Sequence, residues 1–576
     1  MCRAQFLAQI KMCKENGFSG FNHLPEWQLY DIIHYMVTRA RISKIPAVRE
    51  LASLMLEHGV TRCVLCPGSR NAPLCATFSA IEDFECRHVT DERSAGFAAL
   101  GWAAQAQSPV AVCVTSGSAL LNLHPAVAEG FYRHIPVLVI SADRPAAWIG
   151  QQDGQTLPQP GVFANLVRKS INLPQEDADG WYTNRLINEA LLELTHRNGG
   201  PVHLNIPLAE PLFETDDTPL APVRCIRRTE LARMTAQDEQ ELLEIVAALP
   251  KRVILLGQNA NVPYIPEALT QDHAFALVGE HLCNYPAADC TRPDTLVGRN
   301  SDFPDIPSPD LLITIGGCIV SKRLKQMLRN NPPTEHWHIC ADGEVCDTFC
   351  CLTRIIEGDP DELLDLLAAF AEEGDESYRK LWQSAPAEFS ADYCGMTLVG
   401  ELIRHLPTPS VLHLGNSSAV RYAQLFSLPP GVQVECNRGV NGIEGSLSTA
   451  LSFACGDARP QYIVCGDLSF FYDMNALWLQ HNVSPNVRIL LLNNGGGGIF
   501  KTIGTPKINC VEAPHNASAE AWVKDRGFHY CCTRQMADVA AAIAELTTNA
   551  SRPILLEAFT NSAQDAQILK EFYTLH

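Results

Sequence analysis

The sequence predicts an α/β protein with three consecutive doubly wound parallel-sheet domains. From about residue 44 onward, short apolar runs alternate with helical patterns, which is typical of parallel sheets with crossover helices. Charged, proline-containing links near 214–235 and 371–397 divide this pattern into three blocks. A chain of 576 residues is also too long for a single core.

The elements follow in order along the chain. An amphipathic helix is expected over IPAVRELASLMLEHGV, at the start of the first block. The strands of that block are expected in CVLCPGSR (63–70), VAVCVTSGS (110–118), IPVLVISADRP (135–145) and VHLNIP (202–207). Those of the second are expected in RVILLG (252–257), LLITIGG (311–317) and HWHICAD (336–342). Those of the third are expected in SVLHLGNSS (410–418), VQVECNRG (432–439), YIVCGDLS (462–469), VRILLLNN (487–494) and PILLEAF (553–559).

We therefore expect the three domains to span residues 44–220, 221–392 and 393–576. Residues 1–43 show neither this pattern nor the hydrophobic region of a signal peptide. We interpret them as an N-terminal extension and leave open whether it is disordered.

Composition narrows the classes of function. A formal net charge of −20 argues against a nucleic-acid or anionic-membrane binder, so an anionic substrate requires a local cationic pocket. No apolar run approaches the roughly 20 residues that span a bilayer. The 22 cysteines are interpreted as small buried residues kept reduced, which predicts a cytoplasmic protein.

Polar and glycine-rich residues follow the predicted strands of the first and third blocks. The strands finish in PGSR, TSGS, SADRP, GNSS, NRG, GDLS and NNGGGG. Ligands of open α/β sheets bind beyond the carboxyl ends of the strands. The first and third domains are therefore predicted to build a site, which the second supports.

A carboxylate and an amide follow two neighbouring strands of the third block. Asp467 comes just after one strand and Asn494 just after the next, with a crossover helix expected in DMNALWLQ. Carboxylate and amide oxygens at one sheet edge suit Mg²⁺. The alternative is a helix cap and a turn, which is the more frequent reading of either residue alone.

At this point the sequence resembles the thiamine-diphosphate enzyme superfamily, whose cofactor motif is Gly-Asp-Gly and then Asn-Asn 25 to 30 residues later. Here it reads Gly466-Asp467-Leu468 and Asn493-Asn494, so Leu468 replaces the third glycine. The resemblance implies that Asp467, Asn494 and the Gly496 carbonyl bind Mg²⁺ or Mn²⁺. It implies further cofactor contacts from Ser417, Ile443, Gly466, Leu468, Ser469 and Ile499.

Thiamine chemistry also needs an acid that hydrogen-bonds the aminopyrimidine ring. The resemblance implies that Glu92, in TDERSAGF, is this catalytic acid and a cofactor contact. The alternative for Glu92 is a carboxylate in the first turn of a helix. Ile443, in NRGVNGIEG, would hold the cofactor in its bent form, and a core anchor is its alternative.

The resemblance is closest to the 2-succinyl-5-enolpyruvyl-6-hydroxy-3-cyclohexene-1-carboxylate (SEPHCHC) synthase family of menaquinone biosynthesis. It rests on CPGSRNAPL, TDERSAGF, TSGSALLNLHPAVAEG, SADRP, GQTLPQPGVF, GNSSAVR, NRGVNGIEG and GDLSFFYDMNAL, and it runs from about residue 46 to the C-terminus. It implies pyrimidine-binding, central and diphosphate-binding domains. The implied reaction is decarboxylation of 2-oxoglutarate and 1,4-addition of the succinyl carbanion equivalent to isochorismate.

Both implied substrates are dianions, for which guanidinium groups are suitable partners. The resemblance assigns Arg421, Arg438 and Ser417 to the succinyl part, and Ile499 and Phe500 to the substrate side of the cofactor. It assigns isochorismate to Ser69, Arg70, Arg144, Gln155 and Lys322. Surface arginines in salt bridges are the alternative reading.

Three glycines depart from the family pattern. Gly154 stands where the family often has an asparagine, which puts one substrate contact in doubt. Gly495 and Gly498 stand where an asparagine and a glutamine are usual, and the sequence gives no reason for either.

Two other functions stay open at this stage. One is a different thiamine-diphosphate 2-oxoacid decarboxylase or carboligase, and the other is a non-catalytic subunit with the same fold. The resemblance also implies a homodimer or tetramer with the active site at the subunit interface. No nucleic-acid partner and no membrane insertion are expected.

Overall fold

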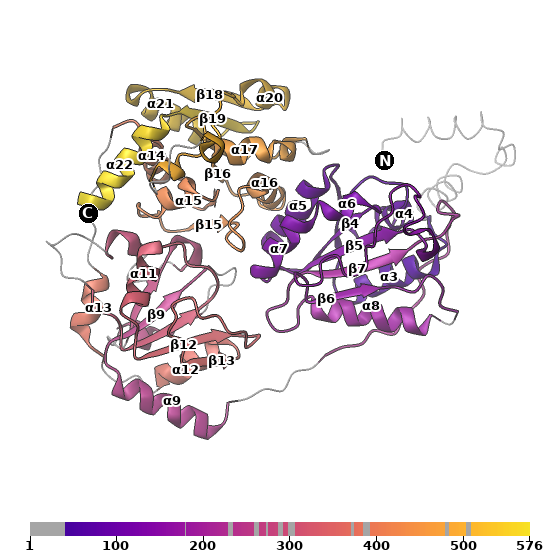
Figure 1. The fold of residues 1–576 in the computed structure, drawn as a ribbon, viewed down its shortest axis with the longest axis horizontal. Coiled ribbons are helices and arrows are strands. Elements are labelled where there is room, and N and C mark those ends of the chain that lie inside the picture. The colour runs from indigo at the N-terminus through magenta and orange to yellow at the C-terminus, as the bar shows by residue number, and fades with distance from the viewer. Residues whose placement is uncertain are drawn as a thin grey trace, which may run out of the picture.

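The computed structural model describes residues 41–178, 180–228, 234–258, 264–271, 275–285, 292–297, 306–369, 374–383, 392–478, 483–502 and 509–575. Three parallel sheets with their helices lie in these residues, which confirms the predicted fold class. In Figure 1 the first unit faces the third across α5, α7 and α16, and the second unit lies beside the third. The exact domain bounds stay a prediction.

The first sheet has the strand order β3-β2-β4-β5-β7-β6. Its strands are β2 (Arg62–Leu65), β3 (Glu85–His88), β4 (Val110–Val114), β5 (Val137–Asp143), β6 (Lys169–Asn172) and β7 (Val202–Pro207). Its helices are α3 (Pro46–Glu57), α4 (Ala72–Ala80), α5 (Glu92–Ala106), α6 (Ser118–Leu121), α7 (His124–Tyr132) and α8 (Trp181–Glu193). The edge strands β3 and β6 escaped prediction because ECRH and KSIN are too polar to form an apolar run.

The second sheet has the order β10-β9-β11-β12-β13. Its strands are β9 (Arg252–Leu256), β10 (Ala276–Gly279), β11 (Leu311–Ile315), β12 (Glu335–Cys340) and β13 (Arg354–Glu357). Its helices are α9 (Ala236–Ala248), α10 (Glu267–Gln271), α11 (Lys322–Asn330), α12 (Pro360–Ala369) and α13 (Glu376–Trp382). Asn284 ties this unit to the third, because it donates to the Val434 carbonyl and accepts from the Val434 N–H.

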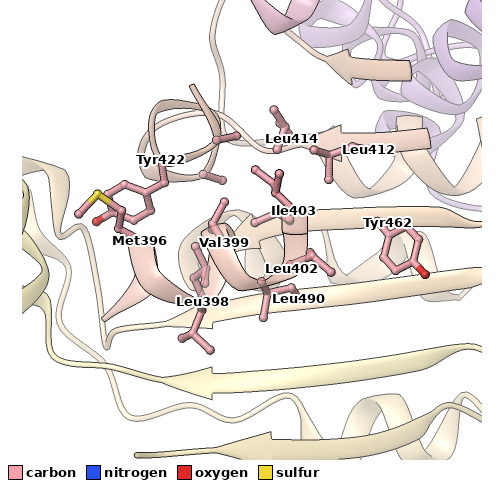
Figure 2. Close-up of a cluster of buried hydrophobic side chains, with 14 of the residues drawn as sticks. Met396, Leu398, Val399, Leu402, Ile403, Leu412, Leu414, Tyr422, Tyr462 and Leu490 are labelled. Atoms are coloured by element: carbon pink, nitrogen blue, oxygen red, sulfur yellow. The ribbon is translucent and has the colours of Figure 1, made fainter. Parts of the chain in front are cut away.

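The third sheet, β15-β14-β16-β17-β19-β18, repeats the order of the first. Its strands are β14 (Ser410–Leu414), β15 (Val432–Cys436), β16 (Gln461–Gly466), β17 (Val487–Asn493), β18 (His529–Thr533) and β19 (Ile554–Phe559). Its helices are α14 (Gly395–Arg404), α15 (Ser418–Ala423), α16 (Ser446–Ala454), α17 (Asp467–Tyr472), α18 (Ile499–Thr502), α19 (Asn509–Glu512), α20 (Glu520–Asp525), α21 (Met536–Thr547) and α22 (Ser562–Leu575). Figure 2 shows its core, where α14 packs Leu402 and Ile403 against Leu412 and Leu490 of the sheet.

The crossover from β16 to β17 differs from the prediction. The helix α17 begins at Asp467 itself, and the 3₁₀ turn η5 (Met474–Leu477) follows it, whereas one helix was expected in DMNALWLQ. Asp473 lies between the two, and its buried carboxylate accepts from the N–H and hydroxyl of Ser448 on α16. The end of this predicted helix lies outside the described residues.

The start of the chain is described only from residue 41, so the predicted extension lies almost wholly outside the described residues. Ile42–Ser43 form β1, which pairs antiparallel with β8 (Thr215–Asp216). No helix in the described part of the chain is long and apolar enough to cross a membrane.

Cys63 and Cys66 form a C-x-x-C pair, a spacing that also occurs in metal and redox sites. Both thiols are buried at β2, and burial is the main cause that raises their pKa values. The described residues contain no cluster of three His, Cys, Asp or Glu side chains that could hold a metal ion. The pair therefore belongs to the core of the first unit.

Candidate active site

Two neighbouring strand ends bring the predicted metal ligands to one edge of the third sheet. Gly466 of β16 is in register with Leu492 of β17, so Asp467 and Asn494 follow adjacent parallel strands. The Asp467 carboxylate is buried, and its Oδ2 accepts from the N–H groups of Gly495 and Gly496 at 2.8 and 3.0 Å. Burial raises the pKa of Asp467, while these hydrogen bonds act in the opposite direction.

Asn494 carries the feature that most favours a cation. Its Oδ1 is buried and has no hydrogen-bond partner among the described residues, whereas its Nδ2 donates to Asp565 Oδ2 at 3.4 Å. A buried amide oxygen without a partner is costly in a protein interior. With the Asp467 carboxylate at the adjacent strand end, such an oxygen fits a hard cation such as Mg²⁺.

The glycines after Asn494 are required by the backbone and by close neighbours. Gly495 and Gly496 have φ of +76° and +145°, a region that favours glycine. A Cβ on Gly496 would lie 2.6 Å from the Glu512 carbonyl oxygen, and a Cβ on Gly498 would lie 2.7 Å from Asn494 Nδ2. The two glycines that the family pattern left unexplained thus have local physical reasons in this chain.

Glu92 is the first residue of α5, but another carboxylate caps this helix. Asp91 Oδ1 accepts from two backbone N–H groups of the first turn at 2.9 and 3.2 Å. The other oxygen of Asp91 accepts from Asn475 of the third unit at 2.8 Å. Glu92 is half-buried beside this contact and accepts from Asn122 Nδ2 at 3.4 Å. Asp91 is therefore the cap, while Glu92 is a carboxylate in the first turn of α5, so both interpretations of Glu92 stay open.

The helices α5 and α16 pack with their backbones close together. A Cβ on Gly101 of α5 would lie only 2.1 Å from the Thr449 carbonyl oxygen of α16. Arg87 adds a hydrogen bond from its Nη1 to the Ser452 carbonyl at 2.9 Å. This contact brings Glu92 and the loop between β15 and α16, which carries Arg438 and Ile443, to the same interface.

We call residues 437–445 the NRG loop. Ile443 in this loop is 36% exposed, and its carbonyl oxygen accepts from the Ser469 hydroxyl of α17. Asn416, just before Ser417, donates to the carbonyl groups of Asn437 and Gly442 in the loop. Of the predicted cofactor contacts, Ser469 is therefore bonded directly to Ile443. Ser417 is connected to the same loop through its neighbour Asn416.

Arg438 and Arg421 lie near the same strand ends. Arg438 is buried and donates from Nη1 to Asn416 Oδ1 at 2.9 Å, while its Nε has no partner among the described residues. Arg421 is half-buried on α15, and no described residue accepts a hydrogen bond from it. Ile499 and Phe500 open α18, directly after the glycines, and both are half-buried.

In the first unit, Arg70 and Arg144 form a second cationic group. Arg70 is buried, its Nη1 donates to the Leu208 carbonyl at 2.9 Å, and its Nε has no described partner. Burial and, next, the charge of Arg144 lower the pKa of Arg70. Arg144 lies 3.7 Å from Asp153, between Nη1 and Oδ2. Arg70 Nη2 also lies 3.4 Å from Glu210 Oε1, so both arginines have a carboxylate partner and the salt-bridge alternative stays open beside an anion site.

The remaining predicted substrate residues are exposed. Ser69 and Gln155 are exposed, and Gln155 has a φ of +57°. A Cβ on the neighbouring Gly154 would meet nothing within 4 Å, so the missing side chain leaves open space. Lys322 is exposed at the start of α11, and its ammonium group has no partner among the described residues. The structure does not bring Lys322 into contact with the other predicted residues.

Sequence reasoning missed three carboxylate or imidazole groups at this site. Glu129 of α7 accepts from the NRG loop, and it stands in the quoted motif HPAVAEG, where a carboxylate among small residues was the available signal. His515 has its Nε2 3.3 Å from Asp467 Oδ2. Asp565 of α22 holds Asn494. Nothing in the sequence pattern pointed to His515 or Asp565.

Comparison with known proteins identifies the fold and the family. Residues 47–162 match the family model described as thiamine pyrophosphate enzyme, N-terminal TPP binding domain. A thiamine diphosphate-dependent 4-hydroxybenzoylformate decarboxylase of Rhodococcus jostii RHA1 superposes with a TM-score of 0.69 at 18% identity, over 90% of this chain and 99% of that one. At this identity the likeness bears on the fold alone. The matched N-terminal domain and the fold define a thiamine-diphosphate enzyme.

More similar relatives are named SEPHCHC synthases. The chain is 48% identical to the synthase of Phocaeicola vulgatus over 91% of its own length and 97% of the relative. It is 47% identical to that of Bacteroides thetaiotaomicron, over 91% and 98%, and 35% identical to that of Flavobacterium johnsoniae, over 92% and 99%. The chain belongs to the SEPHCHC synthase family. The predicted family is confirmed, and with it an enzyme that acts on small molecules.

Proposed function

We propose that this chain decarboxylates 2-oxoglutarate and adds the resulting succinyl group to isochorismate in a 1,4 sense. The products are SEPHCHC and CO₂, in menaquinone biosynthesis. The observation that carries the proposal is membership of the synthase family along nine-tenths of the chain. The buried guanidinium groups of Arg70 and Arg438 support it, because each substrate carries two carboxylates.

The cofactor of the proposal is thiamine diphosphate with a divalent metal ion. When bound, thiamine diphosphate supplies the electron sink that decarboxylation of a 2-oxoacid requires. Asp467, Asn494 and the Gly496 carbonyl would hold Mg²⁺ or Mn²⁺, which the partnerless Asn494 Oδ1 supports. Glu92 would exchange a proton with a ring nitrogen of the aminopyrimidine. The remaining cofactor contacts would be Ser417, Ile443, Gly466, Leu468, Ser469 and Ile499.

The substrates divide between the two cationic groups. Arg421, Arg438 and Ser417 would bind the distal carboxylate of 2-oxoglutarate and keep its keto carbon near the cofactor. Isochorismate would lie on the side of the first unit, held by Ser69, Arg70, Arg144 and Gln155, and the proposal adds Lys322 from the second unit. Ile499 and Phe500 would exclude water on the substrate side.

The proposal extends to assembly, location and domain roles. Residues 44–220, 221–392 and 393–576 would act as pyrimidine-binding, central and diphosphate-binding domains. The enzyme would be a homodimer or tetramer with its active site at the subunit interface, and it would work in the cytoplasm. The first and third units also contact each other within one chain, where Asp91 accepts a hydrogen bond from Asn475 at 2.8 Å.

The test is a reconstitution with the purified chain. We expect CO₂ release and the product mass only when 2-oxoglutarate, isochorismate, thiamine diphosphate and Mg²⁺ are all present. CO₂ release without consumption of isochorismate would indicate another 2-oxoacid decarboxylase, and failure to bind the cofactor would indicate a non-catalytic subunit. Arg438→Met should abolish turnover, whereas Arg404→Met, at an exposed arginine of the same unit, should not.

A further inference from the structure

The C-terminal helix α22 supplies a carboxylate that contacts the amide of Asn494. Asp565, in the first turn of α22, is 4% exposed. Its Oδ2 accepts from Asn494 Nδ2 at 3.4 Å and from the Thr560 hydroxyl at 2.7 Å, and its Oδ1 accepts from the Gly395 N–H at 3.0 Å. All three neighbours act as donors, so both oxygens of Asp565 act as acceptors here.

The two ends of a side-chain amide have similar shapes but opposite hydrogen-bonding roles. The NH₂ end donates and the oxygen end accepts, so a carboxylate beside an amide fixes the NH₂ end toward itself. Asp565 therefore determines that Asn494 Oδ1 faces away from it. That oxygen is the buried atom with no hydrogen-bond partner among the described residues, which leaves it available to a cation.

Other contacts hold α22 against the same segment. Lys501 of α18 donates to the Ser562 hydroxyl at 2.6 Å, and Lys570 donates to the Lys501 carbonyl at 2.8 Å. Gly498 leaves the space next to Asn494 Nδ2 that any side chain would fill. The helix α22 and Gly498 together fix the position of the Asn494 amide, so its contact with Asp565 is supported by the surrounding packing.

We propose that Asp565 is a positioning residue for the metal site: it binds the NH₂ end of Asn494 so that Oδ1 is presented to a divalent cation. This inference rests on the proposed function, because it requires Asn494 to be a metal ligand. Asp565 itself would not touch the metal. Groups that orient metal ligands in this way commonly contribute about 10- to 100-fold to metal affinity.

The decisive variant is Asp565→Asn. The introduced amide has only one oxygen, and this oxygen will accept the hydrogen bond from the fixed Gly395 N–H. Its NH₂ end will then face Asn494. Two NH₂ ends cannot bond, so Asn494 should turn its oxygen away from the cation. We expect Mn²⁺ to bind about 10- to 100-fold more weakly in the presence of thiamine diphosphate, measured by electron paramagnetic resonance. Turnover at saturating Mn²⁺ should recover most of the wild-type rate.

A second variant separates orientation from simple structural damage. Asn494→Asp combined with Asp565→Asn exchanges the two groups and conserves charge. A carboxylate at position 494 has an oxygen at either end, so it can accept from the introduced NH₂ and still face the cation. We expect Mn²⁺ affinity to return to within about fivefold of wild type. Asp538→Asn, the same change at an exposed position of α21, is the matched control and should have no effect.

The outcomes are distinct. Wild-type Mn²⁺ affinity in Asp565→Asn would overturn the positioning role and leave the proposed function intact. An equal loss in the single and double variants, with a lower melting temperature in both, would reduce Asp565 to a structural residue. Absence of Mn²⁺ binding by the wild-type chain with thiamine diphosphate would overturn the proposed metal site and the inference with it.

Discussion

Replacing Glu129 by glutamine tests whether the first unit positions the NRG loop of the third. Glu129 lies on α7 and is 1% exposed. Its Oε1 accepts from the Gly439 N–H at 2.9 Å and its Oε2 from the Val440 N–H at 2.8 Å. The loop that it holds carries Arg438 and Ile443, a proposed substrate contact and a proposed cofactor contact.

The size of the effect follows from these two bonds. Glutamine has nearly the same shape but only one acceptor oxygen, so one buried backbone N–H would face an NH₂ group. A hydrogen bond to a charged group contributes about 1.5–3 kcal/mol, and an unsatisfied buried N–H costs a similar amount. We take about 2–3 kcal/mol for Glu129→Gln, which corresponds to about 30- to 150-fold in the equilibrium between the held and released loop.

The assay measures the KM for 2-oxoglutarate and the Kd for the cofactor separately. We expect the KM for 2-oxoglutarate and the Kd for thiamine diphosphate each to rise at least about tenfold, because both contacts lie on one loop. Glu82→Gln makes the same change at an exposed glutamate of the same unit and should leave both constants unchanged. If Glu129→Gln left the KM, the Kd and the melting temperature at wild-type values, the reasoning about this carboxylate would be wrong.

Three further predictions concern the acid, the glycines and pH. Glu92→Gln should lower kcat by more than about 100-fold while thiamine diphosphate still binds, as calorimetry can show; unchanged turnover would contradict the role of the acid. Gly496→Ala should weaken Mn²⁺ binding by more than about tenfold, since its φ is +145° and its Cβ would clash, whereas Gly154→Ala meets open space and should be neutral. Burial lowers the pKa of His203 to about 4. The unfolded state then binds the proton first, so this imidazole contributes full stability above about pH 6.5 and loses up to about 3 kcal/mol as pH falls toward 4. In urea unfolding, the free energy of unfolding of His203→Gln should fall less between about pH 7 and pH 5 than that of the wild type. An equal pH dependence in the two proteins would refute this prediction.

The metal site illustrates what strand patterns can predict. Asp467 and Asn494 were expected at one sheet edge because parallel strands end on the same side, and β16 and β17 do lie in register there. The roles of the arginines were implied by the family resemblance instead, although Arg70 and Arg438 also follow strand ends and are buried there. A strand-end pattern is local and periodic, so it is visible in the sequence alone.

The partners of these residues could not be predicted in this way. Asp565 lies 71 residues after Asn494, and Glu129 lies 310 residues before Gly439. Their contacts depend on how α22 and α7 pack, and packing at such separations leaves no periodic signal. Gly498 was unexplained for the same reason, because its crowding depends on the orientation of the Asn494 amide.

The NRG loop connects the two halves of the proposed site, and this has a measurable consequence. Glu129 of α7 and Arg133, which caps the end of α7, hold it from one side, with Arg133 donating to Asn437 Oδ1 at 3.2 Å. Loss of Glu129 should therefore weaken 2-oxoglutarate and cofactor binding in similar proportion. Loss of Arg438 alone should weaken 2-oxoglutarate binding and spare the cofactor. If both variants weakened only substrate binding, Glu129 would act on Arg438 alone, and the loop would not move as a unit.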